Sequence, residues 1–252
     1  MTYREWKIRK CLRLARNWVL FLAACGGAVA LMATGILWLL PKAHAMIAGP
    51  APFTARNYDS SSYVFDAADA RLVVVNANLA LEEEPAPELA VGDDATGEQL
   101  EAEAAQADGV ELNLVTGWQD ADARTAAYEA RLTAYSAENS RLSAEEAADH
   151  TASLQPAAST SEQGTGYCAD ILSPDCTEKT AAFAETRAYE WLTAYAAEYG
   201  FILRWPEDRQ SATGMVYAPW HWRYVGVENA RKISASGLCF EDYIAQLHTL
   251  AG

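Results

Sequence analysis

Residues 218–226 read APWHWRYVG, and residues 161–171 read SEQGTGYCADI. The first stretch places His221 between two tryptophans. The second places Asp170 on a strand-like segment that follows a glycine turn. A single histidine in an aromatic cluster is more often structural than a metal ligand, so any chemical role for His221 depends on the residues that accompany it. These two stretches carry most of what the sequence says about fold and function.

The sequence around the two stretches predicts a mixture of helices and strands. Apolar residues recur at helical spacing up to Tyr199, and Gly200 lies where a C-cap glycine is expected. The expected elements are a helix over 183–199, a strand over 201–205, a hairpin-like pair formed by 215–217 and 220–225, and a helix over 228–234.

The preceding part of the chain gives a second set of expected elements. They are strands over 71–76 and 110–115, and helices over 96–107 and 120–137. Ser143 and Glu146 have the spacing of a capping box, which predicts that another short helix begins there. Because strands and helices do not alternate with a regular βαβ period, we expect an α+β fold rather than a doubly wound sheet. A single domain over 63–252 fits this pattern.

The N-terminal part is predicted to anchor the chain in a membrane. After a basic head (1–17), residues 18–40 carry no charge and are long enough to cross a hydrocarbon core of roughly 30 Å as a helix. Basic flanks stay cytoplasmic, so we expect residues after about 45 to be extracytoplasmic, with 41–62 as a tether. A signal peptide is the alternative, because residues 43–45 resemble a cleavage site.

Charge and cysteine content narrow the classes of partner. Beyond residue 50 the chain has 12 Lys and Arg against 33 Asp and Glu, so its surface repels nucleic acids and other polyanions. Three cysteines lie in this part of the chain. Outside the membrane a Cys168–Cys176 disulfide with a free Cys239 is permitted, and so are three free thiols.

The two stretches resemble the zinc D,D-carboxypeptidases of the vancomycin-resistance type, which belong to the LAS metallopeptidases. That family carries a Ser-x-His-x-x-Gly-x-Ala-x-Asp motif and, further along, a Glu-x-x-His motif. The likeness extends through residues 189–192, 199–206, 213–214 and 239–243. It covers residues 70–246 and is firmest over 161–246. It implies an α+β, D-Ala-D-Ala carboxypeptidase-like domain behind the membrane helix.

The resemblance also implies roles for particular residues. In the family, the motif His, the motif Asp and the final His hold zinc, and the motif Glu takes a proton from the zinc-bound water. Here Asp170 and His221 occupy two of the ligand positions, whereas Gln163 occupies the first ligand position and Ala218 the general-base position. The family's arginine for the substrate carboxylate corresponds to Gln119.

These replacements are expected to remove hydrolysis. Loss of a general base costs on the order of 10²–10⁴ in rate. A neutral amide is a poor zinc donor beside imidazole, carboxylate or thiolate. Loss of the guanidinium removes a bidentate grip on a carboxylate. Three losses in three roles predict a domain that keeps its shape without its chemistry, with no resident cofactor, or with zinc if any metal is retained.

The leading hypothesis is therefore an extracytoplasmic binding or scaffolding module. Its expected partner is a peptidoglycan stem peptide or an envelope protein, and the candidate binding residues are Trp118, Gln119, Tyr217 and Trp220. One alternative is a working zinc carboxypeptidase with an unorthodox ligand set, such as Cys168 with Asp170 and His221. Another is an assembly role for the membrane helix, which would leave the outer domain passive.

Overall fold

The computed structural model describes residues 69–77, 79–81, 105–106 and 108–251, all of which belong to the unit Phe53–Gly252. The predicted head, membrane helix and tether lie outside the described residues, as does most of the predicted helix over 96–107. Among the described residues, no helix has both the length and the hydrophobicity that a membrane span requires. Membrane attachment and the domain boundaries therefore stay predictions.

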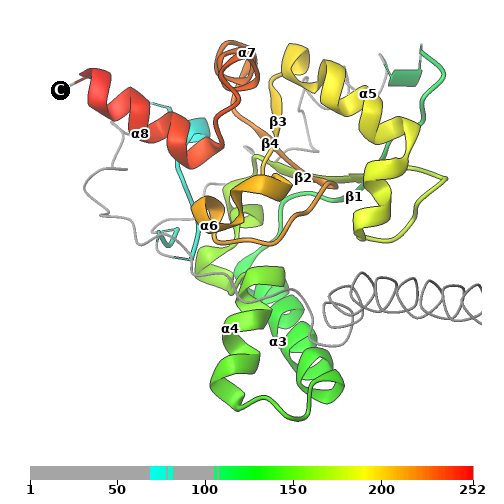
Figure 1. The fold of residues 1–252 in the computed structure, drawn as a ribbon, viewed down its shortest axis with the longest axis vertical. Coiled ribbons are helices and arrows are strands. Elements are labelled where there is room, and N and C mark those ends of the chain that lie inside the picture. Colours follow the sequence, from blue (N-terminus) through cyan, green and yellow to red (C-terminus); the bar gives the residue numbers. More distant parts are fainter. Residues whose placement is uncertain (1–68, 78, 82–104, 107, 252) are drawn as a thin grey trace, which may run out of the picture. The chain divides into compact units, whose positions relative to one another are not determined.

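A four-stranded antiparallel sheet lies at the centre of the described fold (Figure 1). Its strands, in the spatial order β1-β2-β4-β3, are β1 (Asn113–Thr116), β2 (Cys168–Leu172), β4 (His221–Tyr224) and β3 (Phe201–Leu203). The two stretches that decide the fold thus lie side by side, as β2 and β4. Their register sets Asp170 opposite His221 and Cys168 opposite Arg223.

The sheet has one charged face and one apolar face. Because successive side chains of a strand point to opposite faces, the pairs Asp170–His221 and Cys168–Arg223 share one face, and Trp222 lies on the other. The apolar face is part of the main core. That core comprises Ala105, Val110, Ala169, Ile171, Leu172, Phe183, Ala188, Trp191, Leu192, Ala196, Phe201 and Trp222.

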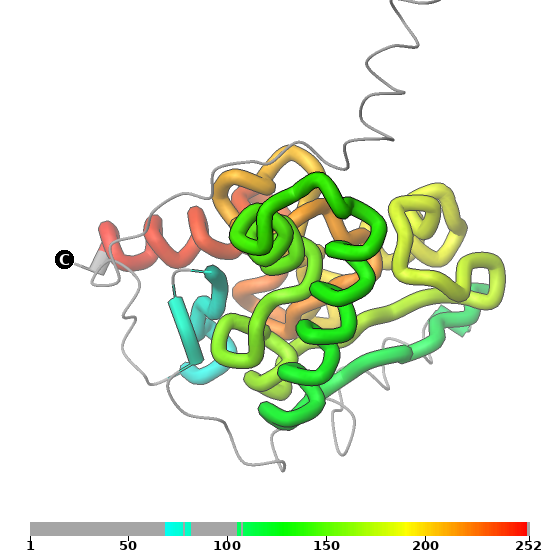
Figure 2. The backbone as a smooth tube through the Cα atoms, turned by 90° about the horizontal axis from the view of Figure 1, so that it is seen from below, coloured from blue at the N-terminus to red at the C-terminus, as the bar shows by residue number. Residues whose placement is uncertain are grey.

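Helices cover both faces of the sheet. The hairpin of α3 (Ala121–Glu138) and α4 (Ala144–Leu154) lies on one side, and α5 (Arg187–Tyr195) and α7 (Val227–Ser236) lie on the other (Figure 1). Figure 2, seen from below, shows the α3–α4 hairpin in front. The remaining helices are α6 (Gln210–Thr213) and α8 (Phe240–Ala251), with the 3-10 turns Ala70–Leu72, Ala158–Thr160, Glu162–Thr165, Ala181–Glu185, Ala196–Tyr199 and Glu207–Arg209.

Local signals at helix ends were predicted well. Helix α3 begins after Asp120, whose side chain accepts a hydrogen bond from the Ala123 N–H at 2.7 Å. The capping box is present, since the Ser143 hydroxyl and the Glu146 carboxylate each accept from the other's backbone N–H. Gly200 ends the 3-10 turn Ala196–Tyr199, which follows α5, with φ +93°, and a Cβ there would lie 2.6 Å from the Tyr224 ring.

Two predicted strands are wrong. Residues 71–76 form a 3-10 turn and an extended segment with a single bridge at Asn76, because the buried Arg223 guanidinium binds the carbonyls of Arg71 and Val73 in place of a neighbouring strand. Residues 215–217 do not pair with β4; the Val216 N–H donates to the Ser153 carbonyl. Strand β4 pairs instead with β2 and β3. The predicted strand over 110–115 is displaced to 113–116.

Candidate functional site

A cavity of about 340 Å³ opens on the charged face of the sheet. Its lining combines two cations, one carboxylate, one imidazole and two amides with apolar side chains. The lining residues are Arg131, Leu154, Gln155, Pro156, Gln163, Asp170, Lys179, Trp205, Val216, Trp220 and His221. The cavity thus brings Gln163 and Asp170, which are seven residues apart in one motif, together with the distant His221. We refer to it below as the cleft.

Asp170 holds the centre of the cleft through both of its carboxylate oxygens. Oδ1 is hydrogen-bonded to His221 Nδ1 at 2.6 Å, and Oδ2 accepts from the Lys179 ammonium group at 2.6 Å. The same ammonium donates to the Thr116 hydroxyl at 2.7 Å. Burial raises the pKa of Asp170, but His221 and Lys179 outweigh it and bring the pKa below its usual value. The carboxylate is therefore ionised and fully engaged.

His221 is fully buried and is held by a ring stack and by its hydrogen bond to Asp170. Its ring stacks on Trp205 with centroids 3.8 Å apart and planes 12° apart. Burial lowers the pKa of His221, yet the adjacent Asp170 carboxylate outweighs this and raises the pKa well above its usual value. The neighbouring carboxylate thus favours the protonated form of the ring.

Behind His221 lies a second buried carboxylate. Glu162 Oε2 is 3.6 Å from His221 Nε2, and Glu162 Oε1 accepts from Arg204 Nε at 2.8 Å. Burial raises the pKa of Glu162, but the guanidinium groups of Arg204 and Arg223 outweigh it and hold the pKa well below its usual range. Glu162 is thus an ionised carboxylate beside His221 Nε2, on the side of the ring opposite Asp170.

Gln163 lies beside Asp170 and His221 but is not poised to bind a metal. It belongs to the 3-10 turn Glu162–Thr165, and its amide oxygen accepts a hydrogen bond from the Ser161 hydroxyl at 2.8 Å. The next residue, Gly164, is pressed against Arg124, since a Cβ there would lie 2.6 Å from the guanidinium. The turn is therefore fixed by a hydrogen bond and by close steric contacts within the protein.

The other predicted site residues are divided by the structure. Trp220 lines the cleft, whereas Trp118, Gln119 and Tyr217 do not. The Gln119 N–H donates to the Gln163 carbonyl at 3.2 Å, and the Tyr217 hydroxyl donates to the Tyr189 hydroxyl at 3.1 Å. Ala218 is buried and packs with Trp205 and Met215. Binding roles for Trp118, Gln119 and Tyr217 stay predictions.

The described residues do not fit a catalytic zinc ion at this place. Zinc ligands bind at about 2.0–2.2 Å, which sets neighbouring ligand atoms roughly 3.3 Å apart in a tetrahedral site. In the described arrangement Asp170 and His221 are hydrogen-bonded to each other at 2.6 Å, and the Lys179 ammonium group is bound to Asp170 at 2.6 Å. Neither Gln163 nor Ala218 supplies the missing imidazole or base. No catalytic step through a metal follows from this arrangement.

A different group of ligand-type side chains lies close by. Atoms of Glu162, Cys168 and His221 lie within 4.8 Å of one another, and all three residues are buried. Asp170 is not part of this group, unlike in the predicted set of Cys168 with Asp170 and His221. Arg223 Nη1 lies 3.8 Å from Cys168 Sγ, and Arg204 binds Glu162, so two positive charges already compensate the site. These surroundings disfavour a further cation.

The three cysteines in the described part of the chain are not joined to one another. Cys168, Cys176 and Cys239 are free thiols, so the predicted option of a Cys168–Cys176 disulfide is not realised. Cys168 lies in β2, whereas Cys176 lies in the turn that follows and forms an isolated backbone β-bridge with Ser173.

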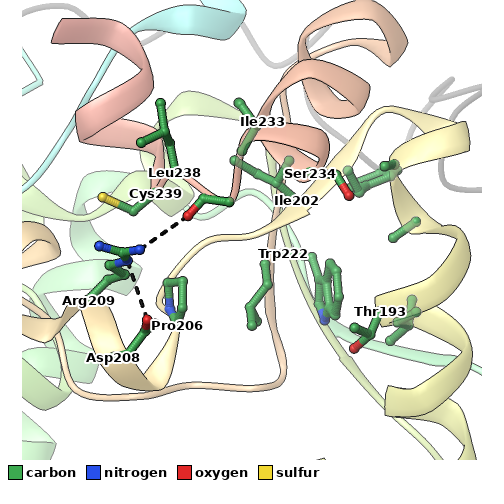
Figure 3. Close-up of a pocket in the computed structure, with 16 residues that line it drawn as sticks. Thr193, Ile202, Pro206, Asp208, Arg209, Trp222, Ile233, Ser234, Leu238 and Cys239 are labelled. Carbon is green, nitrogen blue, oxygen red and sulfur yellow. Dashed lines mark hydrogen bonds and ion pairs between the residues drawn. The ribbon is translucent and has the colours of Figure 1, made fainter. Parts of the chain in front are cut away.

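A second hollow, of about 310 Å³, is a weaker candidate (Figure 3). Apolar side chains line most of it, including Ile202, Trp222 and Ile233. Its charged groups, Arg209 and Asp208, are paired with each other. Burial raises the pKa of the Cys239 thiol at its edge to about 12, which leaves the thiol protonated and unreactive at neutral pH. The charged face therefore remains the candidate site.

The two cationic residues of the cleft were not predicted from the sequence. Lys179 lies in the segment between β2 and the turn Ala181–Glu185, and Arg131 lies in α3. Neither belongs to a motif. One signal was available for Lys179, because it is the only Lys or Arg between Arg141 and Arg187, and it follows Asp170 by nine residues.

Comparisons with known proteins agree on one family. The family model described as VanY, D-alanyl-D-alanine carboxypeptidase, matches residues 95–227, more than half of the chain. A D-alanyl-D-alanine carboxypeptidase of Enterococcus faecalis is 33% identical over 142 residues, which cover 56% of this chain and 50% of that protein. This chain spans about half the length of the curated relatives that it matches most extensively.

Two solved structures extend the likeness to the fold. One is a mutant of the vancomycin-resistance D,D-pentapeptidase VanY from a VanB-type cassette in complex with Zn(II); the other is VanYB in complex with D-alanine-D-alanine. Both are 26% identical to this chain with a TM-score of 0.59. The match covers 70% of this chain and 99% of the first structure, and 69% and 97% for the second. The predicted α+β carboxypeptidase-like fold is thus confirmed.

Proposed function

The chain belongs to the VanY D-alanyl-D-alanine carboxypeptidase family, and from this premise we propose that it is a member that binds cell-wall peptides without cleaving them. The alternative within this proposal is an envelope protein as the partner in the same cleft. Family membership suggests the kind of ligand, since one related structure holds D-alanine-D-alanine. The residues that replace the family's zinc ligand and general base suggest that hydrolysis has been lost.

One observation carries the proposal. Gln163, an amide that lines the cleft, and Ala218, a buried methyl group that packs with Trp205, stand at the two positions that the family resemblance assigns to a zinc ligand and a general base. Asp170 is hydrogen-bonded to both Lys179 and His221. A buried cavity with aromatic walls and several hydrogen-bonding groups is still suited to holding a ligand.

The proposal predicts binding without turnover. Full-length protein is expected to bind a synthetic stem peptide ending in D-Ala-D-Ala with one-to-one stoichiometry, measured by calorimetry. The tryptophan emission should change as well, because Trp205 and Trp220 line the cleft. Released D-alanine, measured in the same samples, should stay at the level of a protein-free blank.

A pair of variants locates the binding. Trp220→Ala should weaken the peptide affinity about tenfold or more, as removal of a buried aromatic anchor commonly does. Tyr195→Ala removes an exposed aromatic residue of α5 that is not part of the cleft, and should leave affinity unchanged. Release of D-alanine at ordinary enzyme rates would rule out the non-hydrolysing assignment, and equal loss in both variants would rule out the cleft.

A second candidate function is a zinc carboxypeptidase with an unorthodox ligand set. The observation in its favour is the buried group of Glu162, Cys168 and His221. This candidate requires stoichiometric zinc in the purified protein together with release of D-alanine. Cys168→Ser should then abolish both. We place it second because two guanidinium groups already balance the charge of Glu162.

We further propose that the domain acts outside the cytoplasmic membrane, held by the predicted helix over 18–40 with its N-terminus in the cytoplasm. The proposal follows from the uncharged run and the basic residues before it. Protease added to intact wall-stripped cells should remove an epitope tag placed after residue 252 and spare one placed before residue 1. Protection of the C-terminal tag would contradict this orientation.

A further inference from the structure

Lys179 occupies an unusual position for a flexible, partly exposed side chain. Its Nζ lies 2.6 Å from Asp170 Oδ2 and 2.7 Å from the Thr116 hydroxyl, so two groups from the adjacent strands β1 and β2 hold it. Asp170 itself is 3% exposed. The 40% exposure of the Lys179 side chain shows that it reaches inward from the surface to a buried carboxylate.

The cleft cannot hold this ammonium group and a divalent cation on the same carboxylate. A zinc ion bound to Asp170 Oδ2 would lie about 2.0–2.2 Å from that oxygen, within a few ångströms of Lys179 Nζ. A unit positive charge that close to a dication is strongly repulsive even at an effective dielectric constant of about 20. Lys179 must therefore leave before a metal can enter.

The ammonium group also changes what the cleft attracts. The lining contains the guanidinium group of Arg131 and the ammonium group of Lys179, against the single carboxylate of Asp170. The chain as a whole carries a net charge of −15, so a cationic cavity stands out against its surroundings. Two of the three donors of the Lys179 ammonium group are engaged, so the third can donate a hydrogen bond to a ligand carboxylate.

We propose that the Lys179 ammonium group is the resident cation of the cleft: it takes the place of a metal beside Asp170 and lets the cleft bind a ligand carboxylate without metal. The ligand chemistry is that of a peptide with a free C-terminal carboxylate, and this part rests on the proposed function. The replacement of the metal does not rest on it, because it concerns only Lys179 and Asp170.

Zinc titration of the full chain by calorimetry tests the replacement directly. Gln163→His restores an imidazole but leaves Lys179, so it should bind zinc weakly. Gln163→His with Lys179→Met should bind zinc at least about tenfold more tightly, the scale on which groups next to metal ligands act. Equal zinc affinity in the single and double variants would overturn the proposal.

The matched control is Lys232→Met in the Gln163→His background. Lys232 also forms a 2.6 Å ion pair, with Glu228, but on the exposed face of α7. It should leave zinc affinity unchanged. Lys179→Gln provides a second uncharged variant that can still donate a hydrogen bond to Thr116. If circular dichroism shows that this variant is folded, and it also fails to raise zinc affinity in the Gln163→His background, the charge argument is wrong.

Peptide binding in the presence of a chelator tests whether the cleft binds a ligand carboxylate without metal. The wild-type chain should bind the stem peptide equally well with and without EDTA, and should bind its C-terminal amide at least about tenfold more weakly. Lys179→Met should remove this preference for the free carboxylate, whereas Lys232→Met should keep it. Retention of the preference in Lys179→Met would overturn the carboxylate role. A wild type that binds neither peptide would end the proposed function, while the zinc titration would still decide the role of Lys179.

Discussion

Full-length protein carrying Gln163→His, Ala218→Glu and Lys179→Met is expected to bind one zinc ion and to release D-alanine from a D-Ala-D-Ala peptide. The first change supplies an imidazole beside Asp170 and His221, and the third removes the ammonium group from Asp170. The second supplies a carboxylate at the position of the missing base. Relative to the same protein with Ala218, we expect a gain on the order of 10²–10⁴ in hydrolysis rate, the usual contribution of a general base.

The matched control is Ala218→Gln in the background of the other two changes. A glutamine side chain at this position has nearly the shape of glutamate but cannot take a proton at neutral pH, so this variant should bind zinc as the glutamate variant does without the gain in rate. Ala218 is buried with Trp205 and Met215, so unfolding of each variant must be compared as well. Equal rates with glutamate and glutamine would show that residue 218 does not face the reacting water.

We expect the triple variant to recover zinc binding more fully than hydrolysis. Gln119 stands at the position that the family resemblance assigns to a carboxylate-binding arginine, and it does not line the cleft. Substrate affinity in the triple variant therefore depends on Arg131 and Trp220. If a folded triple variant bound no zinc, the placement of Gln163 at the first ligand position would be wrong.

The site was partly predictable because its core is set by two motifs. The segments around Asp170 and His221 were expected to converge on the strength of a family resemblance, and the β2–β4 register sets these two residues opposite each other. No local pattern of apolar and polar residues predicts that pairing, since the two residues are 51 positions apart. Lys179 was not predictable in the same way, because a loop residue's direction depends on the tertiary structure around it.

The errors in the fold have a common physical cause. Residues 71–76 have the β-branched composition of a strand, yet their carbonyls bind Arg223, a residue 150 positions away. A local pattern records which side chains favour extended backbone, but not which distant group will satisfy the backbone hydrogen bonds. Helix α8 was missed although Phe240, Tyr243 and Ile244 have helical spacing and lie in a buried apolar cluster.

The second large effect concerns the buried charges behind the site. Arg204 is fully buried, and its guanidinium donates to Glu162 Oε1 at 2.8 Å and to both oxygens of Glu241 at 2.8 and 2.6 Å. Arg204→Met should lower the free energy of unfolding by about 3–5 kcal/mol, because it leaves two buried carboxylates without their main counter-charge. That is a large share of the roughly 5–15 kcal/mol typical of a domain. Chemical denaturation of the full chain measures it.

Arg209→Met is the matched control, since Arg209 is partly exposed and lies 3.5 Å from the exposed Asp208. It should change the free energy of unfolding by only about 0–1 kcal/mol. Adding Glu241→Gln to Arg204→Met should recover part of the loss, because one uncompensated charge is then removed. Equal destabilisation by the two arginine changes would mean that Glu162 and Glu241 do not depend on Arg204. The positive charge that keeps Glu162 ionised beside His221 would then come from Arg223, whose Nη1 lies 3.7 Å from Glu162 Oε1.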